Sequence, residues 1–174
     1  MALALTSNTD LITDRALPLD AKGSTPLFDS IERAVRLVKG GRNRRKVVVV
    51  ITDGEDTSSR LNLLELERRI EEADIHLYVI QLWAGSVSDE RFALRRISEY
   101  TGGIFFGDVV LKQFASVLAT MDIHQQYVIA FQPKRTAGKK TFHGIQLRVS
   151  AKVKLDAARV FSRSGYEESQ PTVR

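Results

Sequence analysis

The sequence predicts an α/β fold in which a doubly wound, mostly parallel sheet is flanked by helices, with an antiparallel β extension at the carboxyl end. Short apolar, β-branched runs alternate with segments whose apolar residues recur at helical spacing. The runs over residues 46–51 and 75–82 are almost continuously apolar, which is typical of parallel strands that are buried on both faces. This alternation of strand and helix is what a parallel sheet with right-handed crossovers requires.

The composition is that of one globular domain. The chain has 174 residues, of which 43% are hydrophobic and 27% charged, and this excludes disordered, collagenous and coiled-coil classes. No apolar run approaches the roughly 20 residues of a membrane span, and the first residues lack the pattern of a signal peptide. Cysteine is absent, which excludes disulfides, Cys-ligated metals and thiol nucleophiles. The sequence assigns no compartment.

The net charge of +5 (26 Lys+Arg against 21 Asp+Glu) comes mainly from two short loops. These loops, over residues 39–46 and 134–140, carry no interleaved aromatic residues and resemble no nucleic-acid-binding module. We interpret them as solvated loops beside strands and expect no nucleic-acid partner.

The first half of the chain is predicted to hold two short strands, a helix and a buried strand. We expect the short strands over Leu3–Thr6 and Asp10–Thr13, and the helix after a loop that begins at Ser24, with Gly40-Gly41 at its end. The buried strand covers Lys46–Ile51. A capping box of Asn62 and Glu65 then opens the next helix, which leads to a second buried strand over Ile75–Leu82.

The second half is predicted to continue with a helix over Ser88–Thr101 and a short strand over Gly103–Gly107. A further helix is marked by Leu111, Phe114, Ala115 and Leu118. Strands over Tyr127–Gln132 and Phe142–Val149 flank a basic turn, and Val160–Tyr166 adds a last strand. We therefore expect an α/β domain over residues 1–126, an antiparallel extension packed on it over 127–166, and a flexible tail over 167–174.

An acidic cluster follows the first buried strand. In open parallel sheets ligands bind beyond the carboxyl ends of the strands, and Lys46–Ile51 delivers Thr52-Asp53-Gly54-Glu55-Asp56 to that edge. Three carboxylates and a hydroxyl group suit Mg²⁺ or Mn²⁺. Asp-Gly also marks ordinary turns, so these residues alone favour a cation site and a plain turn equally.

A second polar loop, Gly23-Ser24-Thr25-Pro26-Leu27, precedes the first long helix. Pro26 suits the first helical turn. The Thr25 hydroxyl has two interpretations, which the sequence leaves open: it caps the helix, or it binds a cation at the same edge of the sheet.

Together these loops resemble the metal-ion-dependent adhesion site of the von Willebrand factor A domain, also called the integrin I-type domain. Gly23-Ser24-Thr25 resembles its threonine loop and Thr52–Asp56 its Thr-Asp-Gly-x-Asp loop. The resemblance covers most of the chain and extends to the stretches Leu27-Phe28-Asp29-Ser30, Tyr100-Thr101-Gly102-Gly103, Gln126-Tyr127-Val128 and Arg163-Ser164-Gly165-Tyr166, which look like a bacterial subfamily related to this domain. It implies that Thr25 and Asp53 ligate Mg²⁺ or Mn²⁺, surrounded by Ser24, Gly54, Glu55 and Asp56.

The third loop of that site, Asp-x-Ser-x-Ser, does not occur in this sequence. Leu3–Thr6 resembles the family's second strand, so the chain resembles a domain that lacks its first strand and helix, and we expect a fragment rather than a degenerate relative. Thr25 and Asp53 would then hold Mg²⁺ weakly or not at all. The strand edges that the missing strand leaves unpaired predict self-association.

The resemblance implies a non-enzymatic adhesion or protein-interaction module, whose cation keeps a coordination position open for an acidic group of a partner protein. Two alternatives are a metal-dependent hydrolase, for which the sequence shows neither a base nor a substrate cradle, and a metal-free scaffold. The histidines His76, His124 and His143 have no metal-ligand spacing, and we expect them to be core or surface residues.

Overall fold

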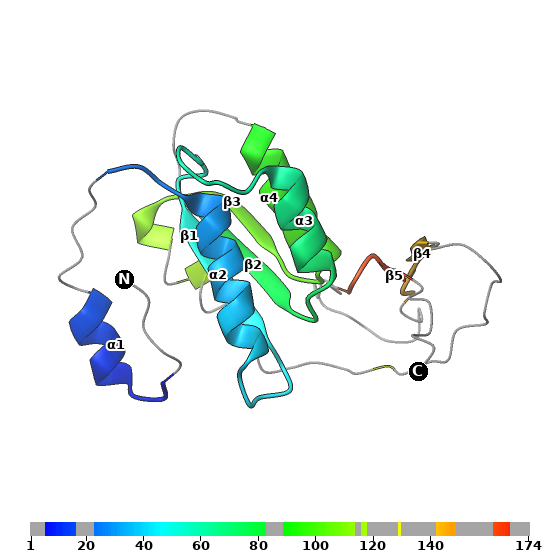
Figure 1. Cartoon of the computed structure of the whole chain (residues 1–174), viewed down its shortest axis with the longest axis horizontal. Coiled ribbons are helices and arrows are strands. Elements are labelled where there is room, and N and C mark those ends of the chain that lie inside the picture. The colour runs from blue at the N-terminus through cyan, green and yellow to red at the C-terminus, as the bar shows by residue number, and fades with distance from the viewer. Residues whose placement is uncertain are drawn as a thin grey trace.

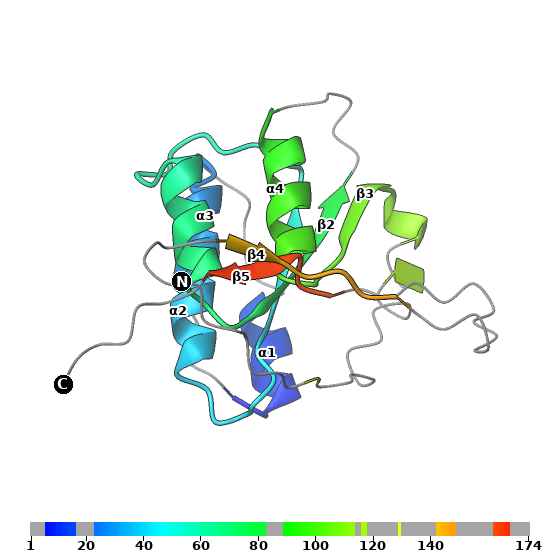
Figure 2. The same ribbon diagram turned by 90° about the vertical axis from the view of Figure 1, so that its right-hand side faces the viewer.

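The computed structural model describes residues 6–16, 23–82, 89–113, 116–117, 129, 142–148 and 162–167. Its centre is a three-stranded parallel sheet in the order β1-β2-β3. The strands are β1 (Val47–Thr52), β2 (His76–Leu82) and β3 (Phe105–Val109). Figure 1 and Figure 2 show the helices α2 (Leu27–Lys39), α3 (Leu63–Glu71) and α4 (Asp89–Tyr100) on one face of this sheet. These elements confirm the predicted α/β fold.

The helices form where the sequence supplies both an apolar stripe and end signals. Asn62 and Glu65 make the predicted capping box at the start of α3: the Asn62 side chain accepts from the Glu65 N–H, and the Glu65 side chain accepts from the Asn62 N–H. Helix α2 ends at Gly40, as predicted. Its buried residues Ile31 and Val35 join one core with β1, α3, β2 and α4, so burial of this stripe holds the layers together.

The sheet is buried unevenly. The middle strand β2 is buried along its length except at its two ends, as predicted for a strand covered on both faces. Strand β1 is not: Val49 and Ile51 are 41% and 53% exposed. The prediction that β1 is buried on both faces is therefore wrong, because among the described residues β1 is the edge strand of the sheet and only its Val48 and Val50 side lies under the helices.

A helix, α1 (Thr9–Ala16), stands where a short strand was predicted over Asp10–Thr13. The Asn8 side chain accepts a hydrogen bond from the Leu11 N–H at 3.1 Å, which is the bond that an N-cap residue makes. This local signal outweighed the short apolar pattern. Leu3–Leu5, most of the other predicted short strand, lie outside the described residues.

The strand β3 is shifted by two residues from its predicted position over Gly103–Gly107. Gly103 instead ends α4, where its N–H donates to the Ser98 carbonyl. A Cβ at Gly103 would lie 1.9 Å from the Leu77 carbonyl oxygen, so only glycine permits this close approach. Asp108, with φ of 57°, is held near the end of β3 by an ion pair with Arg91 of α4.

The carboxyl-terminal segment forms a separate two-stranded antiparallel sheet, β4 (Phe142–Gly144) with β5 (Gly165–Glu167). The strand predicted over Phe142–Val149 stops at Gly144. The alternating apolar residues after Gly144 do not form a buried face, since Leu147 is 44% exposed. The sheet lies near the end of α4, where the Ser164 N–H donates to the Tyr100 carbonyl. The strand predicted over Tyr127–Gln132 and most of the helix predicted around Phe114–Leu118 lie outside the described residues.

Candidate metal site at the carboxyl edge of the sheet

The candidate site begins with a tight turn at the end of β1. The buried Gly54 has φ of 104°, and its N–H donates to the Thr52 hydroxyl at 3.0 Å. Asp53 is exposed, and its carboxylate accepts two long hydrogen bonds, from the Thr52 hydroxyl at 3.5 Å and from the Glu55 N–H at 3.4 Å. The turn therefore presents the Asp53 carboxylate at the carboxyl edge, as the sequence predicts.

Gln81, near the end of β2, supports this turn with a side-chain hydrogen bond. Its amide nitrogen donates to the Asp53 carbonyl at 3.1 Å, although the side chain is only 3% exposed. A Cβ at Gly54 would lie 2.3 Å from that nitrogen. The Gln81 Oε1 atom is buried and has no hydrogen-bond partner among the described residues, so the site holds one acceptor with no donor assigned to it.

The threonine loop is joined to the acidic loop by paired backbone contacts. The Thr25 N–H donates to the Thr57 hydroxyl at 2.7 Å, and the Thr57 N–H donates to the Thr25 carbonyl at 2.9 Å. The structure thus brings together the two loops that the sequence singled out. The Thr25 side chain is exposed at this junction.

Asp56 and Ser59 cap helix α2. Asp56 accepts from the Phe28 N–H at 3.2 Å, and the Ser59 hydroxyl accepts from the Asp29 N–H at 3.1 Å. Ser59 in turn donates to Asp56 at 2.5 Å. Pro26 precedes the helix rather than opening it, and no side chain at the N-cap position makes a capping bond. The capping role considered for Thr25 is therefore wrong, because groups from the acidic loop satisfy these amides.

Asp29, on α2, makes the reverse contacts to the loop after β1. We call these contacts, together with those of Asp56 and Ser59, the clamp. Its carboxylate accepts from the Arg60 N–H at 3.1 Å and from the Leu61 N–H at 3.0 Å. These two backbone hydrogen bonds hold the pKa of Asp29 below its usual value. Asp29 and Asp56 are thus reciprocal contacts between α2 and the loop after β1, and they fix the position of Thr25 relative to Asp53.

The predicted donors divide into exposed groups and groups used by the fold. Ser24, Thr25, Asp53 and Glu55 are exposed, whereas Asp56 is engaged at α2 and Gly54 is buried. Within the described ranges no three His, Cys, Asp or Glu residues are grouped so as to hold a metal ion. The donor set of Thr25 and Asp53 suits a hard cation, but it offers at most two ligands, so water would fill the other positions.

A model of the von Willebrand factor type A domain matches residues 8–119, more than half of the 174 residues. The chain belongs to this family. Domains of the von Willebrand factor type A family are generally modules of adhesion and protein interaction. A comparison with curated proteins finds no match.

Among solved structures, the chain is similar to one titled as an uncharacterized membrane-spanning protein from Vibrio fischeri. The two share 14% sequence identity with a TM-score of 0.40, and the alignment covers 67% of this chain and 66% of the other. No helix in the described part of the present chain has the length and apolar character needed to cross a membrane.

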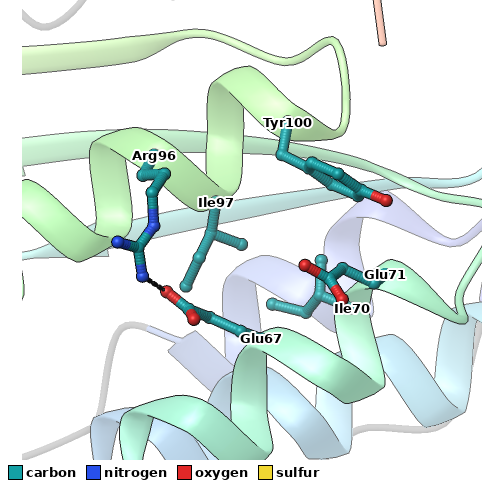
Figure 3. A pocket seen from close by; sticks show the side chains of 6 residues that line it. All are labelled: Glu67, Ile70, Glu71, Arg96, Ile97 and Tyr100. Atoms are coloured by element: carbon teal, nitrogen blue, oxygen red, sulfur yellow. Dashed lines mark hydrogen bonds and ion pairs between the residues drawn. The ribbon is translucent and has the colours of Figure 1, made fainter. Parts of the chain in front are cut away.

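A pocket in the described part of this von Willebrand factor type A domain lies between α3 and α4, away from the acidic turn (Figure 3). It is a hollow of about 80 Å³ floored by Ile70 and Ile97, with Tyr100 at one end. An ion pair between Glu67 and Arg96 crosses it. Its size and this bridge indicate a joint between two helices, not a small-molecule site.

The sequence did not single out Gln81, Thr57 or Ser59, although each shapes the site. A signal for Gln81 exists, since it is a polar residue at the carboxyl end of an otherwise apolar strand, where a ligand-facing or loop-supporting group is expected. Thr57 and Ser59 carry no such signal, because their roles depend on where α2 begins in space.

Proposed function

We propose that this von Willebrand factor type A domain binds a partner protein at the carboxyl edge of its sheet, through a divalent cation held by Thr25 and Asp53. The cation, Mg²⁺ or Mn²⁺, would supply an open coordination position for an acidic group of the partner. The chain's own residues supply two exposed oxygen donors on loops that hydrogen bonds hold in place. We propose no catalytic activity.

The observation that carries this proposal is the reciprocal clamp between the two loops. Asp56 and Ser59 bind the first amides of α2, while Asp29 binds the amides of the acidic loop. A clamp of this kind fixes Thr25 near the turn before any ligand arrives, which lowers the entropic cost of binding. Two protein donors suit an ion that keeps several waters, so we expect millimolar affinity for Mg²⁺.

The experiment measures whether a cation and a carboxylate bind together. A short acidic peptide is titrated into the ¹⁵N-labelled chain in Mg²⁺ and again in EDTA, and amide shifts are followed by NMR. Because coupled binding is reciprocal, we expect the peptide to bind more tightly in Mg²⁺ and Mg²⁺ to bind more tightly with the peptide. The amide shifts should centre on residues 23–25 and 52–57.

Asp53→Ala should abolish this coupling, while the exposed Asp10→Ala, on α1, should leave it intact. Peptide binding that is equal in Mg²⁺ and EDTA would overturn the cation-dependent proposal. Equal binding by Asp53→Ala and the parent chain would remove Asp53 from the site.

Two other functions stay as alternatives with their own readouts. A metal-free scaffold is favoured by the engagement of Asp56 at α2, and it predicts a partner that binds equally in EDTA. A metal-dependent hydrolase predicts turnover of a generic phosphate ester that disappears in Asp53→Ala. Asp53 is common to the cation-dependent possibilities, so its variant separates both of them from the scaffold.

A further inference from the structure

A run of basic residues begins in the second half of α2 and continues through the loop that leads to β1. From Arg33 to Thr52 the sequence holds seven Lys or Arg residues and no Asp or Glu. Five of these are exposed, and we call them the basic end: Arg33, Arg36, Lys39, Arg42 and Arg44. Figure 1 shows this loop at the opposite end of α2 from the loop after β1, so the basic end lies away from the candidate cation site.

On α2 the basic end occupies one face of the helix. Arg36 and Leu37 follow Arg33 by three and four residues, so the three side chains are neighbours on the helix surface. Ile31 and Val35, on the other face, are buried in the core. Leu37 is 41% exposed. This face therefore presents an apolar side chain among cations.

Most of the charge at the basic end is not neutralised within the described part of the chain. Glu32, the acidic residue that precedes the run, is paired with Arg36 and with Arg69 of α3. The other four members of the basic end form no ion pair with a described residue. Cations at the end of a helix also offset its dipole, but Arg42 and Arg44 lie beyond the end of α2. Their charge is therefore available to a partner.

Lys46 fixes the shape of the loop between α2 and β1. Its ammonium group donates to the Gly41 carbonyl at 2.6 Å and to the Asn43 carbonyl at 3.1 Å. The Lys46 carbonyl accepts from the His76 N–H at 2.9 Å, which ties the loop to β2. The exposed arginines of this loop are thus held on a backbone that is ordered before binding, and less entropy is lost when a partner binds.

The composition of the basic end favours a lipid surface over other anionic partners. Residues 29–77 contain no aromatic residue, whereas single-stranded nucleic acids stack on aromatic side chains and protein interfaces are enriched in them. The cations are spread over a helix face and a loop, and the pocket between α3 and α4 lies elsewhere, so this arrangement does not suit one small anion. Anionic phospholipids attract such spread Lys and Arg residues, and an exposed leucine enters the headgroup layer.

We propose that the basic end docks on the surface of an anionic phospholipid bilayer, with its arginines on headgroup phosphates and Leu37 in the headgroup layer. This contact with a membrane surface requires no membrane-spanning helix. Because the basic end and the candidate cation site lie at opposite ends of α2, the carboxyl edge of the sheet stays free for a partner protein. Docking on the bilayer does not depend on the cation site.

The experiment measures co-sedimentation of the whole chain with lipid vesicles in EDTA, so that the cation site does not affect the result. We expect binding to vesicles of phosphatidylcholine with about one third phosphatidylglycerol, no binding to phosphatidylcholine alone, and loss of binding at high salt. Each cation near an anionic bilayer strengthens binding about fivefold. Arg42→Gln combined with Arg44→Gln should therefore weaken binding about 25-fold. Leu37→Ser should weaken binding without changing its salt dependence.

The matched control removes the same charge elsewhere. Arg60 and Arg68 are exposed and lie outside the basic end, so Arg60→Gln combined with Arg68→Gln should weaken binding by less than about threefold. Circular dichroism checks that each variant is folded. Equal losses in the two pairs would show an effect of net charge alone and would overturn the assignment to the basic end. A parent chain that binds neither kind of vesicle at low salt, or binds both equally, would overturn the proposal. Binding to duplex DNA at a salt concentration that abolishes vesicle binding would also overturn it.

Discussion

Replacing Gly54 by alanine probes the turn that presents Asp53. The substitution acts twice: it places a side chain on a backbone with φ of 104°, and it puts a Cβ 2.3 Å from the Gln81 amide nitrogen. Gln81 is only 3% exposed and donates to the Asp53 carbonyl, so its amide cannot move away without losing that bond. The turn and its support should therefore be disturbed together.

Each effect has an approximate magnitude. An L-residue in the left-handed region costs about 1–2 kcal/mol. Displacing Gln81 leaves a buried amide unpaired, which costs about 1–3 kcal/mol more. Gly54→Ala should thus lower the free energy of unfolding by roughly 2–5 kcal/mol.

Gly23→Ala is the matched control, because Gly23 has φ of 89° but nothing within 4 Å of the added Cβ. It should show the backbone cost alone. Urea denaturation followed by circular dichroism measures both variants, and Gln81→Ala in each background tests whether the extra loss comes from Gln81. Equal losses in Gly54→Ala and Gly23→Ala would refute the reasoning.

Further predictions concern the clamp and the core. Asp56→Ala should cost about 0.5–2 kcal/mol in urea denaturation because the Phe28 N–H loses its cap, and Asp56→Asn should recover part of this. Thr101→Val should cost about 1–3 kcal/mol in the same assay, since the buried Leu77 N–H loses its acceptor. The pKa of Asp29 is held below its usual 3.8, so its contribution should be complete above that pH and disappear as the pH falls further. Asp29→Asn should therefore flatten the acid limb of thermal stability measured against pH.

The sequence predicted the elements with strong local signals. The capping box at Asn62 and the glycines that end α2 and α4 act within a few residues, and the structure has them where expected. The helix over Thr9–Ala16 was missed because its apolar residues are few and the cap at Asn8 is its clearest sign. The exposure of β1 could not be read from its composition, since a run of valines looks the same at the centre and at the edge of a sheet.

The site was predictable in part for a similar reason. The position of Asp53 follows from the strand that precedes it, and the sequence placed it at the carboxyl edge. The diversion of Asp56 to the Phe28 amide depends on where the start of α2 lies in space. Gln81 and Ser59 were missed because their partners lie 28 and 30 residues away along the chain. Sequence spacing finds groups that share a loop, and it does not find groups that meet across loops.

Paramagnetic broadening by Mn²⁺ most directly tests the claim that Thr25 and Asp53 form a cation site. Mn²⁺ is titrated into the ¹⁵N-labelled chain, and the loss of amide signals is mapped by NMR. We expect the amide signals of residues 23–25 and 52–57 to disappear first, at millimolar affinity, and Mg²⁺ to compete with this loss. In Asp53→Ala the local broadening should vanish. Broadening that is centred elsewhere, or that is unchanged in Asp53→Ala, would contradict the account.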